Sequence, residues 1–427
     1  MNQTELNDIV IALNSGLVPR SGIEHLMVGR EELIEAVGEE LDKVKNGSSL
    51  TKFLIGRYGT GKSFVQAMIM QKGLAKNFVV SKVDFSPFRR LYNNEGMARA
   101  TYSEIVKNMV SKTSSENAIQ EIIERWLTAR IEETKAEKGQ IDTKYLEQRI
   151  RDEIKEIDNC FGGADFADVL IFYFRALLLG DEAKQRAAIR WISGEYSRIS
   201  DAHKDGLEVS TLISDANYYE FLKVLCKFVT LAGYSGLIIN FDEVVNLYKI
   251  SMKPVRDKNY EMILRIINDT VQGDVHNLYI TFSGTPDLLE DEFRGMYSYG
   301  ALKRRLSYNE YDKEGKQDFS QPVIKLRNLT NEEVFTLLVR LKQIHELYYK
   351  YNSSLSNEEI INFQKYNYEN AAKLSLTTGD IVKNFFGLLN VLHKNPELKT
   401  KILAEWTEQV DSKKETTEDV LSRFEAM

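Results

Sequence analysis

Short apolar runs alternate along the chain with longer stretches in which apolar residues recur at helical spacing. The first pair is a buried strand over Thr51–Ile55 followed by a helix over Phe64–Leu74. Further strands are predicted over Phe78–Phe85, Gly236–Phe241, Asn277–Ser283 and Pro322–Leu326. Because strand and helix alternate through the core, the pattern predicts an α/β fold with a mainly parallel, five-stranded sheet covered on both faces.

The pattern turns strongly helical between the second and third predicted strands, from 94 to 217. A charged stretch over Glu116–Asp158 precedes a more apolar one over Phe166–Leu179. We interpret this region as a large helical insertion. Helices rich in both charges usually present solvated faces, and a dedicated partner-binding surface is the alternative.

A second helical region follows the last predicted strand. Thr330-Asn-Glu-Glu333 is typical of a capping box and predicts a helix that runs to Tyr349. A further helical pair is predicted from Asn357 to about Leu392. We therefore expect an all-helical C-terminal lid.

The chain has 427 residues, which exceeds one ordinary domain. We divide it into an N-terminal segment with the first half of the core, the helical insertion, the second half of the core, and the lid with the C-terminal tail. The corresponding ranges are 1–93, 94–217, 218–328 and 329–427. A net charge of −7 means that any contact with DNA has to come from a local basic patch, so composition gives DNA binding no support.

The segment Gly56-Arg-Tyr-Gly-Thr-Gly-Lys62-Ser63, called the phosphate loop below, matches the P-loop pattern between a predicted strand and a predicted helix. Its glycines let successive backbone N–H groups point at a polyphosphate, Lys62 adds a charge at the β- and γ-phosphates, and the Ser63 hydroxyl can bind Mg²⁺. The alternative is a glycine-rich turn that happens to end in Lys-Ser. The candidate ATP-binding residues of this segment are Gly56, Tyr58, Gly59, Thr60, Gly61, Lys62, Ser63 and Phe64.

Two adjacent carboxylates, Asp242 and Glu243, end the apolar run that begins at Leu237. This is the Walker B position of a P-loop ATPase. There Asp242 would hold the Mg²⁺ shell, and Glu243 would orient and polarise the attacking water. Acidic pairs are also common at strand ends, so the assignment depends on the phosphate loop in the same sheet.

Two further features carry less specific chemistry. Ser283 and Thr285 follow the next strand, where a polar residue could sense the γ-phosphate, although ordinary turn chemistry also explains Gly-Thr-Pro. Arg304 and Arg305 could supply an arginine finger across a subunit boundary in a homo-oligomer. The alternative for these arginines is a basic helix end that interacts with its own dipole.

The cysteines and the apolar runs indicate in which cellular compartment the protein is expected. Cys160 and Cys226 show neither CxxC nor histidine spacing, so no zinc site or disulfide framework is indicated. The segment Met1–Asp8 lacks an apolar signal region, and the apolar run Val169–Leu179 is too short to span a bilayer. We therefore expect a cytoplasmic protein that makes no use of a membrane.

Together these motifs resemble the BREX-system ATP-binding domain family over most of residues 5–390. The segments that carry the resemblance are Gly-Leu-Val-Pro-Arg at 16–20, Val-Gly-Arg-Glu at 28–31, the phosphate loop, Asp84-Phe-Ser-Pro-Phe-Arg-Arg90, the Asp242-Glu243 strand, Ser283-Gly-Thr-Pro286 and Ala301-Leu-Lys-Arg-Arg-Leu306. The family is similar to AAA+ ATPases of the initiator and STAND type, and its members occur with bacterial phage-defence operons.

The resemblance implies roles for individual residues. Val28 and Arg30 would lie near the adenine, Thr285 would act as sensor 1, and Arg304 or Arg305 would be the finger. Lys383 stands where such ATPases often carry a sensor 2 arginine, but lysine cannot make a forked contact with phosphate.

The leading hypothesis is an AAA+-like ATPase that hydrolyses ATP with Mg²⁺ and powers or gates a defence assembly, with other defence subunits and DNA as candidate partners. A slowly turning-over signalling switch of the STAND type is the second. A structural subunit that binds nucleotide only for stability is the third.

Overall fold

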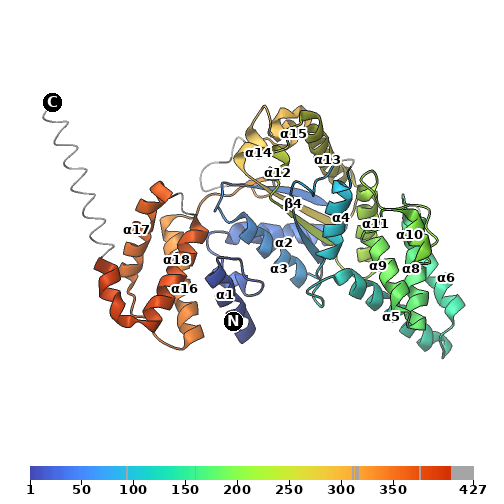
Figure 1. Ribbon diagram of the computed structural model, residues 1–427, viewed down its shortest axis with the longest axis horizontal. Helices are drawn as coiled ribbons and strands as arrows, with labels where there is room; N and C mark the ends of the chain where they lie inside the picture. The colour runs from blue at the N-terminus through green and yellow to red at the C-terminus, as the bar shows by residue number, and fades with distance from the viewer. Residues whose placement is uncertain (93–94, 159, 310–311, 313–316, 375–376, 405–427) are drawn as a thin grey trace. The chain divides into compact units, whose positions relative to one another are not determined.

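The computed structural model describes residues 1–92, 95–158, 160–309, 312, 317–374 and 377–404 (Figure 1). The chain forms two compact units. The helical unit comprises the described residues of Met1–Ile34, Gly56–Met68 and Leu326–Met427, and the sheet unit comprises Glu35–Ile55 and Ile69–Lys325. Our four-part division of the chain stays a prediction.

The sheet unit is built on five parallel strands in the order β2-β3-β4-β1-β5. The strands are β1 Leu50–Ile55, β2 Val79–Asp84, β3 Leu237–Asp242, β4 Leu278–Gly284 and β5 Val323–Lys325. The predicted five-stranded parallel sheet is therefore confirmed, and the predicted strand bounds lie within two residues of those observed. Because the strands are parallel, Ile55, Asp242 and Gly284 all end at the same edge of the sheet.

Two side-chain ladders join neighbouring strands. Phe53, Phe282 and Phe241 stack across β1, β4 and β3 at centroid distances of 5.1 Å, and Phe85 stacks on Phe241 at 5.0 Å. These rings belong to the main hydrophobic core, which lies entirely in the sheet unit. A buried polar ladder joins β3 to β4, where Thr281 donates a 2.6 Å hydrogen bond to the Asn240 side chain. Both ladders specify the register, because a slip by one residue would turn every side chain to the other face.

Helices cover the sheet and extend it. Helix α13 packs on β1, and α4 packs on β2. Figure 1 shows α5, α6, α8, α9 and α10 gathered beside α11 at one end of this unit. The helices of the sheet unit are α4 Met97–Lys107, α5 Ala118–Lys138, α6 Thr143–Glu153, α7 Lys155–Asp158, α8 Gly163–Leu179, α9 Glu182–Ile192, α10 Ile199–Lys204, α11 Tyr218–Leu231, α12 Val245–Tyr248, α13 Lys253–Gln272, α14 Pro286–Glu290, α15 Gly300–Leu306 and the 3₁₀ turn η2 Met296–Ser298.

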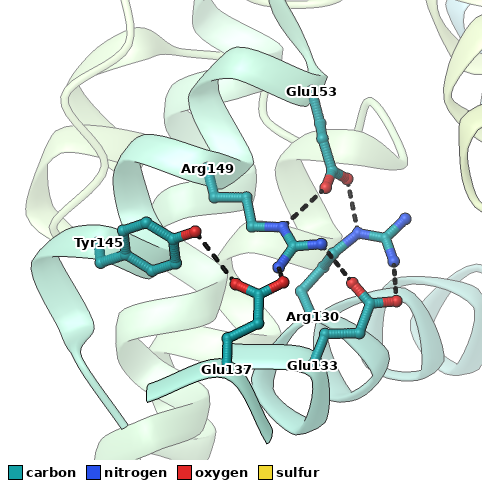
Figure 2. A network of polar contacts seen from close by, with 6 residues as sticks. All are labelled: Arg130, Glu133, Glu137, Tyr145, Arg149 and Glu153. Atoms are coloured by element: carbon teal, nitrogen blue, oxygen red, sulfur yellow. Dashed lines mark hydrogen bonds and ion pairs between the residues drawn. The ribbon is translucent and has the colours of Figure 1, made fainter. Parts of the chain in front are cut away.

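An ion-pair network ties α5 to α6 in the charged part of this helical region (Figure 2). Arg149 on α6 contacts Glu133 and Glu137 on α5 as well as Glu153 on its own helix. Arg130 on α5 reaches Glu153 at 2.6 Å. Desolvation alone would lower the pKa of Arg149, but its acidic neighbours together outweigh it and raise that pKa above its ordinary value. The opposite charges predicted to lie on solvated faces thus also hold two helices together.

The helical unit has its own core. Helix α1 packs against α16 and α18, and α17 packs against both of these helices. The predicted capping box is confirmed, because Thr330 accepts from Glu333 N–H while the Glu333 carboxylate accepts from Thr330 N–H. The helices that lie in this unit are α1 Gln3–Ser15, α16 Asn331–Tyr349, α17 Asn357–Leu374, α18 Thr378–Lys394 and the 3₁₀ turns η1 Ile23–Leu26 and η3 Pro396–Leu398. Two more, α2 Glu31–Lys45 and α3 Lys62–Ala75, begin in the helical unit and end in the sheet unit.

Among the residues that the structure describes, no helix is long and apolar enough to cross a membrane.

Candidate functional site

The phosphate loop, Gly56–Ser63, follows the last residue of β1 directly, and α3 begins at Lys62. Gly59 and Gly61 have φ angles of 79° and 85°, in the left-handed region that residues with a Cβ adopt at a cost. Gly59 also lies against the start of α18, where a Cβ atom would come within 2.4 Å of the Thr377 Cβ. Both backbone conformation and close packing therefore require glycine at position 59.

The Lys62 ammonium lies inside the loop. Its Nζ atom donates to the carbonyl oxygens of Gly56 and Arg57 at 2.9 and 3.0 Å, and it lies 5.3 Å from the centre of the Tyr58 ring. Ser63, the next residue of α3, is exposed. Lys62 thus places a positive charge within the loop and at the N-terminus of a helix, where the helix dipole also favours anions.

Arg30 contacts the backbone of this loop at Thr60. Its Nη2 atom donates to the carbonyls of Thr60, at 3.2 Å, and of Arg327, and its Nη1 atom donates to the Gly29 carbonyl at 2.9 Å. Burial and the neighbouring Arg327 lower the pKa of Arg30 from its ordinary value. Val28 is also buried and belongs to the core of the helical unit. The expectation that Val28 and Arg30 lie near an adenine stays a prediction.

Asp242 is the last residue of β3, and three donors of the sheet unit contact its carboxylate. Lys82 of β2 approaches Oδ2 at 2.9 Å, the Ser283 hydroxyl of β4 donates to Oδ1 at 2.6 Å, and the N–H of Glu243 donates to Oδ1 at 3.0 Å. Burial alone would raise the pKa of Asp242, but Lys82 and these hydrogen bonds outweigh it, so the pKa is lowered. Asp242 is therefore kept ionised and in one orientation.

Glu243 differs from Asp242 in the solvent exposure of its side chain and in its backbone conformation. Its side chain is exposed, and its φ angle of 53° puts a non-glycine residue in the left-handed region. The turn is closed by Asn246, whose N–H donates to the Glu243 carbonyl at 2.9 Å. Non-glycine residues in this conformation are uncommon and concentrate at functional sites. The strand end thus turns the Glu243 side chain out of the sheet while Asp242 stays within it.

The two sensor candidates have different surroundings. Ser283 is buried and donates to Asp242, as described above. Thr285 is the N-cap of α14, where its hydroxyl accepts from Leu288 N–H at 3.4 Å. The turn chemistry that we considered as the alternative is therefore present at Thr285. A sensor role for either residue stays a prediction.

The finger candidates lie in the last turn of α15, and both are exposed. Arg305 donates to the carbonyl of Ala301 in its own helix at 3.2 Å, which is the local contact that we considered as the alternative. In the helical unit, the aliphatic part of Lys383 passes 3.1 Å from where a Cβ of Gly16 would lie. The finger and sensor 2 roles of these residues stay predictions.

Sequence reasoning missed two residues next to the predicted site. Lys82 lies in the edge strand β2, and its contact with Asp242 depends on the pairing of β2 with β3. Thr377 caps α18 in a capping box with Asp380 and lies against Gly59. The spacing of Thr377 and Asp380 fits the capping-box pattern, so the cap could have been found from the sequence. Its contact with the phosphate loop could not.

The chemistry of these groups fits a Mg²⁺-nucleotide. Left-handed glycines, a helix N-terminus and an enclosed ammonium suit a polyphosphate. Within the helical unit the Ser63 hydroxyl, and within the sheet unit the Asp242 carboxylate, is each an oxygen donor of the type that Mg²⁺ accepts. Ile55, which leads into the loop, and Asp242 end at the same edge of one sheet, and ligands of open α/β sheets bind at the carboxyl ends of strands.

A family of known proteins matches nearly the whole chain. It is described as "BREX system ATP-binding protein BrxC/D", and the match spans residues 1–408. No curated protein matches the chain. The resemblance inferred from the motifs is thus confirmed.

Proposed function

The chain belongs to the family of BREX system ATP-binding proteins BrxC/D, and from this premise we propose that it is a Mg²⁺-dependent, AAA+-like ATPase that powers or gates an anti-phage defence assembly. The observation that supports this best is the phosphate loop. Gly59 and Gly61 adopt left-handed conformations there, and the Lys62 ammonium lies within the loop at the start of α3. Such a loop stabilises a triphosphate through backbone N–H groups and one fixed charge.

In this proposal Lys62 binds the β- and γ-phosphates, while Ser63 and Asp242 serve Mg²⁺. Glu243 orients and polarises the attacking water. The contrast between the two carboxylates favours this division of roles. Asp242 is buried and held by three hydrogen-bond donors, which suits a fixed partner of a metal, whereas Glu243 is exposed on a turn that points it away from the strand.

The remaining assignments follow the same proposal. Ser283 or Thr285 senses the γ-phosphate, and Arg304 or Arg305 acts as a finger in a neighbouring subunit of a homo-oligomer. The exposure of both arginines is what a contact in trans requires. Other defence subunits are the expected partners in the cytoplasm, and DNA is a candidate partner.

One observation favours the second candidate, a nucleotide-dependent switch. Within the helical unit the phosphate loop touches the start of α18 through Gly59 and is tied to the segment after β5 through Arg30. A change in the loop on nucleotide exchange would therefore act directly on α18 and on the segment after β5. A switch with slow turnover would use the same binding site.

Steady-state phosphate release at saturating ATP and Mg²⁺, with and without DNA, tests the proposal. We expect turnover in the wild-type protein and a loss of about 10²- to 10⁴-fold in Glu243→Gln, because the neutral amide cannot act as a base. ATP affinity should be retained in this variant. Asp84→Asn is the matched control, since Asp84 is an exposed carboxylate at the end of the adjacent strand and pairs in register with Asp242.

Two results would count against hydrolysis at this site. One is a Glu243→Gln variant that turns over ATP as fast as the wild type. The other is a wild-type protein that binds ATP tightly but releases no phosphate under any of these conditions, which would favour the switch.

A further inference from the structure

Arg30 is a buried cation that contacts three separate segments of the helical unit. Its side chain belongs to a residue only 8% exposed, and its donors reach the carbonyls of Gly29, Thr60 and Arg327. These carbonyls belong to the segment before α2, to the phosphate loop and to the segment after β5. One nitrogen, Nη2, serves both the loop and the segment after β5, so its two hydrogens are divided between them.

The contact with Thr60 determines where the next amide points. In a planar trans peptide, the C=O of one residue and the N–H of the following residue point in opposite directions. A hydrogen bond that holds the Thr60 carbonyl toward Arg30 therefore directs the N–H of Gly61 to the other side of the loop. Gly61 is one of the two left-handed glycines of the loop, and α3 begins at the residue that follows it.

Arg327, whose carbonyl accepts a hydrogen bond from Arg30, is itself held in place. Arg327 makes a two-pronged ion pair with Glu333, with both N–O distances at 2.6 Å. Glu333 also accepts from the Thr330 N–H at 2.7 Å and so completes the N-terminal cap of α16. Gly29 leaves the room that this carboxylate needs, since a Cβ there would come within 2.3 Å of Glu333 Oε1. The Arg327 carbonyl is therefore a rigid support for Arg30.

We propose that Arg30 is a positioning residue of the phosphate loop, which holds the Thr60–Gly61 peptide so that the Gly61 N–H points toward the triphosphate. The inference rests on the proposed function, because it assumes that the loop binds ATP. It gives Arg30 a task that needs a guanidinium, whose planar array of donors can serve acceptors on separate segments at once. A lysine ammonium at the end of a flexible stem cannot reproduce that fixed array.

A purely structural role would also explain a buried arginine, so the test has to distinguish a structural role of Arg30 from a positioning role. The decisive variant is Arg30→Lys, which keeps the positive charge and loses the planar array of guanidinium donors. The matched control is Lys52→Met in the sheet unit. Lys52 is likewise buried and bonded to three carbonyls, those of Phe319, Ser320 and Gln321, but none of them belongs to the phosphate loop.

Three measurements are made on the full chain: the melting temperature, ATP affinity by calorimetry with Mg²⁺, and hydrogen exchange of the peptide that spans 56–66 without nucleotide. We expect Arg30→Lys to bind ATP about 10- to 100-fold more weakly, as for the loss of a charged hydrogen bond, and to exchange faster in that peptide. Lys52→Met should melt at a lower temperature with unchanged ATP affinity in the folded protein.

Arg327→Gln is a second variant in case Arg30→Lys does not fold. It leaves Arg30 in place but removes the ion pair that fixes its support, so we expect a smaller loss of affinity and faster exchange in the same peptide. The inference is overturned if wild type binds ATP and the folded arginine variants match it in both affinity and loop exchange. If wild type itself fails to bind ATP, the proposed function fails instead, whatever the arginine variants do.

Discussion

Lys52 in the sheet unit and Arg30 in the helical unit are two buried cations with similar surroundings and different tasks. Lys52 is 2% exposed and bonds three consecutive carbonyls, at 2.9 to 3.0 Å, and the Glu40 carboxylate. Arg30 is 8% exposed and bonds carbonyls from three different segments. Lys52 thus fastens one stretch of chain onto β1, just before β5 begins, whereas Arg30 joins the phosphate loop to the segments around it.

The difference shows that burial and hydrogen bonding alone do not mark a functional residue. Both cations satisfy the same physical requirement, which is that a buried charge must be compensated. What separates them is the segment at the other end of each hydrogen bond. Only Arg30 contacts a loop whose backbone N–H groups are proposed to bind a ligand. Substitutions at Lys52 should therefore change the stability of the protein, whereas substitutions at the loop should change its affinity for nucleotide.

The largest effect is expected at the loop itself, in Lys62→Ala. The variant removes the charge and leaves the Gly56 and Arg57 carbonyls, which the ammonium now covers, to repel a phosphate. We expect ATP affinity to fall by more than about 100-fold in calorimetric titration, with little change in melting temperature.

Lys72→Ala is the matched control for Lys62→Ala, because Lys72 lies in the last turn of the same helix. It should bind ATP like the wild type. Unchanged affinity in Lys62→Ala would remove the basis for the nucleotide assignment.

The second effect is on stability, in Lys52→Met. The change leaves the Glu40 carboxylate buried and without its cation, and it leaves three carbonyls without their donor. We expect the free energy of unfolding to fall by about 3–5 kcal/mol in denaturant titration. Adding Glu40→Gln to this variant should restore part of the loss, since the new amide is neutral and can still accept from the Tyr279 hydroxyl, which donates to the Glu40 carboxylate at 2.8 Å. No destabilisation in the single variant would contradict this account of Lys52.

The third effect concerns pH and the support of Arg30. The hydrogen bonds from Arg327, together with the cap at Thr330, lower the pKa of Glu333 from 4.5 to about 2 although partial burial opposes the shift. The folded protein therefore binds fewer protons at Glu333 than the unfolded chain does, and the ion pair stabilises fully only above about pH 4.5. Its contribution should decline as the pH falls from 4.5 toward 2.

Thermal unfolding of wild type and Glu333→Gln over this pH range measures the effect. We expect the wild type to be more stable by about 1–3 kcal/mol at neutral pH, as for a charged hydrogen bond, with the difference shrinking on acidification. A difference that stays constant down to about pH 2 would show that the Glu333 carboxylate is not ion-paired with Arg327.

The smallest effect is expected in the exposed network of Figure 2. Arg149 contacts three glutamates, but its side chain is 25% exposed and each glutamate is 23 to 48% exposed. Arg149→Ala should therefore lower the free energy of unfolding by at most about 1 kcal/mol, and added salt should reduce the difference further. A loss as large as that of Lys52→Met would mean that exposure is a poor guide to the energy of these charges.

Local patterns predicted much of the fold. The strands, the helix after the phosphate loop and the capping box of Thr330 and Glu333 follow from residues that are neighbours along the chain, because apolar periodicity and capping act over one or two turns. The phosphate loop is equally local, since glycine, lysine and serine at set spacing have a meaning before any packing is known. Asp242 and Glu243 could be placed at a strand end for the same reason.

Contacts between distant segments could not be predicted in this way. Lys82 meets Asp242 only because β2 pairs with β3 in a given register, and Arg30 meets Thr60 and Arg327 only through tertiary packing. The left-handed turn at Glu243 also has no signal in a glutamate. The contacts of Lys82 and Arg30 each depend on residues that the chain separates widely.

The residues that can bind a phosphate, hold a metal or start a helix are recognisable in the amino-acid sequence, because those properties reside in side-chain chemistry and short-range spacing. Which charges are buried, which carboxylate each cation meets and which way each peptide of the loop points become known only from the folded chain. A buried charge or a strained backbone conformation is stable only when groups from other parts of the chain compensate it, and folding alone brings those groups together.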